Sequence, residues 1–316
     1  MNIDAVVTWV DSTDPKWIQQ YQEVVGEPFK PSLRFTPTDN HPETELKMCL
    51  RLIKQNMPWI RNIFVVTKDG QVPKCLTNEI VVHHSDIGLG HVFNSLAIES
   101  SLHNIPGLSE QFVYFNDDIF VVKPLSPDDL FDSQGRPIVR ILDNRQESEW
   151  ANSLNYTSHL VNGEKYKALP HVPHPLTKRI MAYGENTLRP HWDRTRKCPL
   201  RYRCNEVTPV FASVLLALQN NTATNKTPDP IRDIWIHTVQ SIPDFKRSIR
   251  GKNVVCLGHY MGSFETLEEA LTGSDNDVGR FPGFSGSPGD TDVIYKVLLA
   301  ISILSLIYWM ESSISS

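Results

Sequence analysis

The chain has 316 residues, of which 40% are hydrophobic and 21% are charged, and its formal net charge is −5 at pH 7. These proportions are ordinary for a globular protein, and the length suits one large domain or two modest ones. The acidic balance, with no basic stripe interleaved with aromatic residues, argues against a nucleic-acid partner.

The amino terminus and the cysteines indicate the cellular compartment of the protein. The amino terminus has no basic segment followed by a long apolar core, so it is not a signal peptide, and we expect a cytoplasmic protein. The five cysteines are few, odd in number and scattered: Cys49, Cys75, Cys198, Cys204 and Cys256. This usage favours a reducing compartment over a disulfide framework. Cys198 and Cys204 lack the CxxC spacing of a zinc site, so no structural zinc is expected.

Strands and helices alternate in the first part of the chain. Four β-rich apolar runs predict strands, the last being one central strand or a strand pair: Ile3–Val10, Ile60–Thr67, Ile80–His83 and Phe112–Val122. Helical spacing predicts helices over Thr44–Asn56, which Pro58 ends, and over Val92–Leu102. This alternation predicts an α/β fold with a mostly parallel, doubly wound sheet.

The first predicted strand ends in an acidic turn, Asp11-Ser12-Thr13-Asp14-Pro15. Ligands of open α/β sheets bind outside the carboxyl ends of the strands, so Asp11 and Asp14 stand where a substrate could sit. The same residues could instead cap a helix that begins at Pro15. One residue can do both, so both interpretations stay open.

The pattern weakens between about residues 145 and 203. A helix can form over Gln146–Tyr156, but Lys165–Arg203 is rich in Pro, His and Arg. We expect an irregular insertion that lines a site on the first half of the chain rather than building its own core. Beyond it, Val207–Leu218 predicts an apolar helix or buried segment, Val254–Gly258 a late strand and Thr266–Leu271 a short helix.

The last part of the chain differs in character. The Gly-, Ser- and Pro-rich segment 281–292 reads as a flexible linker, so we expect a single catalytic domain over residues 1–280. After it, Val293–Met310 is apolar with Lys296 as its single charge, long enough to cross a bilayer. The tail predicts either a membrane anchor or a terminal helix docked on protein.

Two carboxylates interrupt the central apolar segment. Asn116-Asp117-Asp118 lies between Phe112–Phe115 and Ile119–Val122, so buried strand is expected on either side of the acids. Buried unpaired charges cost several kcal/mol, and a divalent cation that bridges the carboxylates to a diphosphate is an economical compensation. The alternative is a strand-end turn with both acids in solvent.

The weakly patterned segment contributes basic groups that complement these acids: His171, His174, Arg179, Arg201 and Arg203. Planar guanidinium groups bind phosphate oxygens in pairs, and a histidine can take a proton from an attacking hydroxyl. Acids, arginines and histidines together suit a metal-bound sugar nucleotide, although scattered His and Arg are usually surface residues.

Three blocks carry a resemblance to a known family. They are IDAVVTWVDSTDP (Ile3–Pro15), the long run Glu43–Pro73 continued by Phe93–Val121, and PHVPHPLTKRIM (Pro170–Met181) with RYRCNEV (Arg201–Val207). In this order they resemble the Stealth family, which comprises bacterial capsular-polysaccharide phosphotransferases and the catalytic part of the lysosomal-enzyme GlcNAc-1-phosphotransferase.

The resemblance implies a fold of the GT-A nucleotide-sugar type and a reaction. Such enzymes transfer a sugar-1-phosphate from a nucleotide sugar to a hydroxyl of a polysaccharide or glycan acceptor and release the nucleoside monophosphate. It also implies Mg²⁺ or Mn²⁺ on Asp117 and Asp118, with Asp117 catalytic and Asn116 beside them. His174, or else His171, would exchange the proton, and Arg203 would hold the diphosphate. The nucleotide and phosphate residues would be Asp11, Arg51, Arg179 and Arg201, with a structural role as the alternative for Arg51.

The chain departs from the family pattern in its fourth block. Val255-Cys256-Leu257 is followed by Gly258-His259-Tyr260 where the family has Asn-Asp-Asn, so His259 is a candidate replacement ligand. Two other functions stay open: a glycosyltransferase of the GT-A type that attacks the anomeric carbon, and a membrane-attached binding protein without turnover.

Overall fold

The computed structural model of the protein describes residues 2–29, 43–143, 148–162, 167–226, 233–236 and 251–257, with the single positions 268 and 271. These residues fall within one unit, Met1–Gly273. The predicted linker 281–292, the tail Val293–Met310 and His259 lie outside the described residues.

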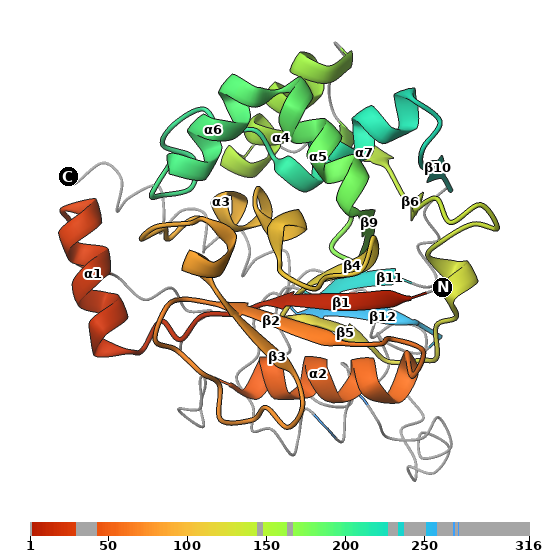
Figure 1. Cartoon of the computed structure of the whole chain (residues 1–316), viewed down its shortest axis with the longest axis horizontal. Coiled ribbons are helices and arrows are strands. Elements are labelled where there is room, and N and C mark those ends of the chain that lie inside the picture. Colours follow the sequence, from red (N-terminus) through yellow and green to blue (C-terminus); the bar gives the residue numbers. More distant parts are fainter. Residues whose placement is uncertain are drawn as a thin grey trace, which may run out of the picture. The chain divides into compact units, whose positions relative to one another are not determined.

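A five-stranded sheet forms the centre of the protein, in the order β3-β2-β1-β4-β9 (Figure 1). Its strands are β1 (Ile3–Thr8), β2 (Ile63–Thr67), β3 (Ile80–His83), β4 (Gln111–Asn116) and β9 (His174–Thr177). The first four run parallel, and β9 pairs with β4 antiparallel. The prediction of an α/β fold with a mostly parallel sheet is therefore confirmed.

Both faces of the sheet are covered, as the buried runs of β1 and β2 require. The helix α2 (Thr44–Asn56) packs on one face, and its residues join Ala5 and Val7 of β1 in one core cluster. Val6, on the opposite side of the same strand, belongs to a second cluster that includes residues of α5 and α7. Figure 1 shows α2 on one side of the sheet and α3 to α7 on the other.

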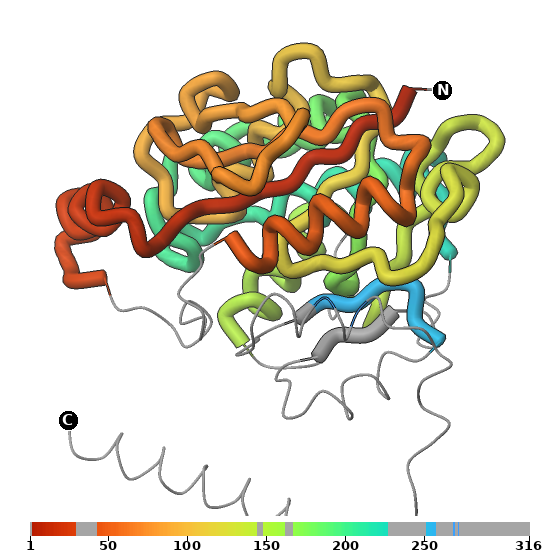
Figure 2. The backbone as a smooth tube through the Cα atoms, turned by 90° about the horizontal axis from the view of Figure 1, so that it is seen from below, coloured from red at the N-terminus to blue at the C-terminus, as the bar shows by residue number. Residues whose placement is uncertain are grey.

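The predicted central segment forms two strands that enter different sheets. After β4 the chain turns at Asp117 and Asp118 and continues as β5 (Ile119–Val121), which pairs antiparallel with β12 (Val254–Leu257). β12 also pairs in parallel with β11 (Asp233–Ile236). Figure 2 shows β5 and β12 running side by side. The acids therefore occupy a two-residue connection between two sheets.

The expectation of an irregular insertion is wrong for most of residues 145–203. This segment forms α4 (Glu149–Asn162), α5 (Lys178–Thr187) and α6 (Arg189–Lys197), and it supplies strand β9. Its buried side chains, among them Trp192 with no exposed surface, extend the second core cluster. The many charged residues of α6 lie on the outer arc of an amphipathic helix, which the sequence pattern did not reveal.

The other elements follow the predictions more closely. Helix α1 (Pro15–Val25) begins at Pro15 and α7 (Pro209–Gln219) covers the predicted apolar segment, whereas α3 (Ser95–Glu99) is shorter than expected. Four two-residue strands complete the fold: β6 (Ile138–Val139), β7 (Leu142–Asp143), β8 (Lys167–Ala168) and β10 (Thr224–Asn225). Of the short helix expected near residue 268, only Glu268 and Leu271 are described.

Candidate active site

The carboxyl ends of the parallel strands place several predicted site residues at one edge of the sheet. Thr8 of β1 pairs with Asn116 of β4, so both strands end side by side. In the antiparallel pair β4–β9, His174 lies opposite Tyr114. The strand order reverses around β1, with β2 on one side and β4 on the other, and ligands of open α/β sheets bind at such a point.

The two acids follow β4 directly at this edge. Asp118 is only 1% exposed, whereas Asp117 is half-buried. The thiol of Cys49, on α2, lies 3.9 Å from the carbonyl oxygen of Asn116. Burial and then the charge of Asp117 raise the pKa of the Cys49 thiol well above its ordinary value, which places that carboxylate close to α2.

A pocket opens beside the acid turn and collects residues from five parts of the chain. Tyr114 and Asn116 line it from β4, His171 and His174 from the segment that enters β9, and Glu99 from α3. Trp150 of α4 and residues at the start of α7 close it. The structure therefore brings both predicted histidines and Asn116 into one pocket.

The imidazole of His174 is held neutral. Burial, and to a smaller extent the neighbouring His171, lowers the pKa of His174 to about 3. No described residue forms a hydrogen bond with this ring, whose centroid lies 6.3 Å from that of Tyr114. A neutral imidazole with free nitrogens can accept a proton or a hydrogen bond from a hydroxyl group.

Glu99 is a candidate site residue that the sequence did not indicate. It is 8% exposed, and its Oε2 atom accepts no hydrogen bond in the described part of the chain. Burial raises the pKa of Glu99 to about 7, although the guanidinium of Arg201 acts in the opposite direction. Ala97-Ile98-Glu99 reads as ordinary helix in the sequence, and only the fold turns this carboxylate toward the histidines.

The arginines Arg201 and Arg203 lie in the loop between α6 and α7. Arg201 donates a hydrogen bond from Nη1 to Oγ of Ser95, 3.2 Å away, in the helix that carries Glu99. Arg203 is exposed, and no described residue forms a hydrogen bond or ion pair with its guanidinium group. This group is available to an anion.

Two other predicted arginines lie elsewhere. β9 runs away from the acid turn, and Thr177 at its end pairs with Gln111 at the start of β4. Arg179 follows there and donates its backbone N–H to Glu110, at the opposite edge of the sheet. Arg51, on α2, forms an ion pair with Glu268 and does not line the pocket.

The acids of the first turn serve the local structure. Oδ1 of Asp14 accepts a hydrogen bond from the backbone N–H of Lys16 and caps α1, and its Oδ2 accepts one from Gln71. Burial alone would raise the pKa of Asp14, but these hydrogen bonds lower it. Oδ1 of Asp11 accepts two hydrogen bonds from Thr13. The capping alternative is thus present for Asp14, whereas Asp11 keeps its place at the carboxyl end of β1.

The fourth block lies next to the acids. Cys256 of β12 pairs with Ile119, the residue after Asp118, so the described end of β12 reaches the acid turn. His259 follows outside the described residues.

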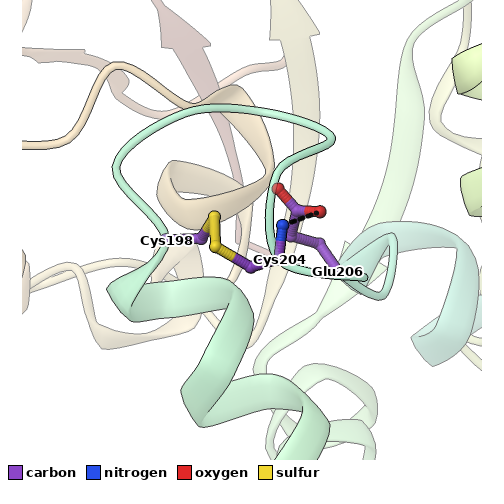
Figure 3. A group of neighbouring side chains, drawn as sticks. All are labelled: Cys198, Cys204 and Glu206. Carbon is purple, nitrogen blue, oxygen red and sulfur yellow. Dashed lines mark hydrogen bonds between the residues drawn. A yellow bond between two sulfur atoms is a disulfide. The ribbon is translucent and has the colours of Figure 1, made fainter. Parts of the chain in front are cut away.

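A cluster of potential metal ligands occurs in the loop after α6. Among the described residues, Cys198, Cys204 and Glu206 form the one group of three such side chains with close ligand atoms. Figure 3 shows, however, that the two sulfur atoms are bonded to each other. The cysteine usage favoured a reducing compartment over a disulfide framework, and this single disulfide was not predicted.

The residues at the acid turn also suit a hard cation. Mg²⁺ prefers oxygen ligands and usually takes only one or two carboxylates, completing its shell with water and substrate phosphate. Asp117 and Asp118 offer two adjacent carboxylates beside a pocket, whereas a preformed cage with a third acid or histidine does not occur in the described ranges. The donor set therefore fits a cation that arrives with a phosphate ligand.

Two models of known protein families match this chain. The model of Stealth conserved region 1 matches residues 1–27, and that of conserved region 2 matches residues 40–139, which contain α2, Glu99 and both acids. The chain therefore resembles Stealth proteins over these two regions. The predicted resemblance is thus confirmed.

The curated relatives of this chain named below are both polysaccharide phosphotransferases. The chain is 42% identical over 149 residues to a capsular polysaccharide phosphotransferase of Neisseria meningitidis serogroup B, covering 42% of this chain and 38% of the relative. An exopolysaccharide phosphotransferase of Streptomyces coelicolor is 30% identical over 321 residues, covering 94% of this chain and 54% of the relative. The chain thus spans about half the length or less of these two relatives.

Solved structures similar to this one include two glycosyltransferases. The galactosyltransferase LgtC, in complex with donor and acceptor sugar analogues, has 10% identity and a TM-score of 0.40, covering 91% of this chain and 98% of its own. Mouse xyloside xylosyltransferase 1 has 7% identity and a TM-score of 0.40, and the match covers 81% of this chain and 97% of the xylosyltransferase chain. Within the residues that the structure describes, no helix combines the length and apolar character needed to cross a membrane.

Proposed function

We propose that this protein acts as a member of the Stealth family and transfers a sugar-1-phosphate from a nucleotide sugar to a hydroxyl of a polysaccharide or glycan acceptor. The observation that carries the proposal is the pocket at the carboxyl end of β4, where Asn116, Glu99 and His174 meet next to Asp117 and Asp118. The names of its curated relatives, capsular and exopolysaccharide phosphotransferases, support the same reaction class.

The proposed step is a displacement at phosphorus. The acceptor oxygen forms a bond to the β-phosphorus of the donor, and the bond from that phosphorus to the oxygen bridging to the α-phosphate breaks. The nucleoside monophosphate leaves with the bridging oxygen, and the acceptor proton passes to the protein. Transfer of this kind depends mainly on positioning and on stabilising charge.

Charge stabilisation is assigned to two sets of residues. Asp117 and Asp118 would hold Mg²⁺ or Mn²⁺, which supplies positive charge to the diphosphate oxygens when bound. Arg203, whose guanidinium is exposed and has no described partner, would bind the remaining phosphate charge. Arg201 would act from the same loop, beside Glu99.

Two groups in the pocket can take the acceptor proton. His174 is neutral and has free ring nitrogens, so it can accept the hydroxyl hydrogen directly. The carboxyl group of Glu99, with a pKa of about 7, changes charge near neutral pH and could hold or accept that proton. We assign the acceptor contact to His174, with Glu99 setting the charge of the pocket around it.

A product analysis tests this function. The protein is incubated with Mg²⁺, a panel of nucleotide sugars and an oligosaccharide acceptor, and the products are followed by phosphorus NMR. A new phosphodiester with release of nucleoside monophosphate supports the proposal, and Asp117→Asn should abolish the signal. Release of nucleoside diphosphate would instead identify a glycosyltransferase, and no turnover of any donor would favour a binding protein.

The arrangement of the sheet supports a nucleotide-sugar fold of the GT-A type. Four parallel strands in the order β3-β2-β1-β4 end at one edge, and the two acids directly follow the last of them. Ligands of open α/β sheets bind where the strand order reverses, so the donor would lie outside the carboxyl ends of β1 and β4, between Asp11 and the acids.

Membrane association is proposed from the sequence of the tail. Val293–Met310 is apolar apart from Lys296, and a membrane-bound position would bring the site close to growing surface polysaccharide. Deletion of residues 290–316 should release the protein from sedimented membranes while transfer to a soluble acceptor continues. A truncated chain that unfolds would contradict this, because the tail would then be part of the core.

A further inference from the structure

The loop Cys198–Glu206 connects α6 to α7 and carries Arg201, whose charge acts on the pocket carboxylate Glu99, and the exposed Arg203. It begins at Cys198, the residue that ends α6, and closes on itself through the disulfide with Cys204 (Figure 3). Arg201 and Arg203 both lie inside the covalent ring. Any change in this bond therefore acts on the two residues assigned to the phosphates.

Buried polar contacts hold both ends of the closed loop. Glu206 is 3% exposed and accepts hydrogen bonds from the backbone N–H groups of Arg203 and Cys204, at 3.3 Å and 3.2 Å. Asn94, which is fully buried, donates from Nδ2 to the carbonyl of Cys198 and to Glu206. The Glu206 carboxylate is thus engaged by the loop itself, which favours a bonded loop over a metal site.

The backbone of the loop adopts conformations that side chains rarely take. Tyr202 has a φ of 68° and Asn205 a φ of 52°, both in the left-handed region. Non-glycine residues are uncommon there, and such residues persist when their surroundings fix them. Ring closure and the Glu206 hydrogen bonds supply that constraint, so an opened loop is expected to lose this shape.

The constrained loop sets where the guanidinium groups lie. Arg201 reaches Ser95 at the start of α3, and its charge acts on Glu99 at the end of that helix. The amide oxygen of Asn94 caps α3 by accepting from the backbone N–H of Leu96. The same asparagine therefore joins the loop to the helix that carries the pocket carboxylate.

We propose that the Cys198–Cys204 disulfide positions Arg201 and Arg203 for the phosphates of the donor, so that the affinity for a diphosphate depends on the state of this bond. The inference rests on the proposed function only in naming the ligand. When a dithiol reduces the bond, each sulfur gains one hydrogen and the dithiol becomes a cyclic disulfide, so the step is balanced. The two cysteines act as positioning residues and not in the chemistry.

The experiment compares oxidised and dithiothreitol-reduced protein, with pyrophosphate and Mg²⁺ as the probe. Isothermal titration should show pyrophosphate binding that weakens about tenfold on reduction, as expected when an arginine loses its fixed geometry. Cys198→Ser/Cys204→Ser should bind as weakly as the reduced protein and no longer respond to the reductant. The matched control is Cys75→Ser, which removes a free, partly buried thiol elsewhere and should respond like the wild type.

Two further readouts separate positioning from general destabilisation. Trypsin should cleave after Arg201 and Arg203 faster in the reduced protein, at temperatures where circular dichroism reports a folded chain. If transfer activity is found, reduction should raise the donor KM about tenfold while kcat changes less. Failure of the proposed function removes only this last readout, because pyrophosphate binding and cleavage do not require turnover.

Equal pyrophosphate affinity and equal cleavage rates in the two redox states would overturn the proposal. So would one zinc per chain in the reduced protein with unchanged affinity, because the thiols and Glu206 would then form a metal site that holds the loop.

Discussion

Tyr114 and His174 face each other across the antiparallel strands β4 and β9, with ring centroids 6.3 Å apart. The tyrosine hydroxyl donates a hydrogen bond to Oδ1 of Asn116, 2.8 Å away, at the position just before the acids. One buried side chain thus connects the predicted base to the turn that carries Asp117 and Asp118.

Removing the hydroxyl group of Tyr114 should weaken the contact between this residue and Asn116. Tyr114→Phe keeps the ring but removes the hydrogen bond to Asn116, so we expect a loss of about 1 kcal/mol in the free energy of unfolding. The turnover of the donor should fall as well, because Oδ1 of Asn116 then keeps only the longer hydrogen bond from Thr8, at 3.4 Å. Chemical denaturation and steady-state kinetics measure the two effects, and unchanged values for both would show that the contact is unimportant.

Arg203→Ala should weaken sugar-phosphate transfer by about a hundredfold, roughly 3 kcal/mol, if its guanidinium binds the diphosphate. The structure offers a matched control in Arg179, another exposed arginine whose guanidinium has no described partner. Because Arg179 lies at the other edge of the sheet, Arg179→Ala should leave kcat/KM unchanged. An equal loss in the two variants would point to overall charge instead of a specific contact.

Glu99→Gln should remove a pH dependence of stability. The pKa of Glu99 is about 7 in the folded protein because burial disfavours the charge, against an ordinary value of 4.5. Because the folded protein favours the protonated carboxyl group, Glu99 contributes its full stabilisation at pH values below its ordinary pKa of 4.5. This contribution is lost as the pH rises through about 7. Between pH 4.5 and 8 the wild type should therefore lose about 3 kcal/mol relative to Glu99→Gln.

Denaturant unfolding of both proteins over this pH range measures the difference directly, and other titrating groups cancel in the comparison. A constant difference between the two proteins across the range would mean that Glu99 titrates normally.

Gly184 marks the close approach of α5 to α7. A Cβ atom at this position would lie 2.8 Å from Oγ of Ser213, so Gly184→Ala should destabilise the protein by about 1–3 kcal/mol. Because the nearest atom belongs to one side chain, Ser213→Ala in the same protein should recover part of the loss. Thermal unfolding of the two single variants and the double variant gives the coupling energy; strictly additive effects would place the strain elsewhere.

Local signals predicted part of the fold well. Helix α2 has the predicted bounds because Leu46, Cys49, Leu50 and Ile53 repeat at helical spacing and Pro58 follows. The strands β1 and β2 were also expected, since β-rich buried runs identify central strands of a parallel sheet. The β-branched residues of β3 predicted that strand too, although it lies at the edge of the sheet and is mostly not buried.

Strand β9 was not predicted, because only its pairing with β4 in the folded protein identifies it as a strand. His174-Pro175-Leu176-Thr177 looks like a loop, since proline interrupts the ladder of a central strand. At the edge of the sheet, where only β4 pairs with it, the proline is tolerated.

The candidate site was predictable in its residue types but not in its arrangement. Arg179 and Arg203 both come from one basic segment, and only the direction of β9 shows that they lie at different ends of the sheet. Glu99 has no distinctive neighbours along the chain, and its importance comes from burial beside His174. The disulfide likewise depends on how close the fold brings two sulfur atoms.

The turn Asp117-Asp118 is fixed at both ends, because β4 is held in one sheet and β5 in another. The two carboxylates of the site therefore lie on the rigid sheets, whereas Arg201 and Arg203 lie in the loop between α6 and α7. Substitutions in the loop between α6 and α7 could then change which donor is preferred, while the carboxylates that would hold the cation stay in place.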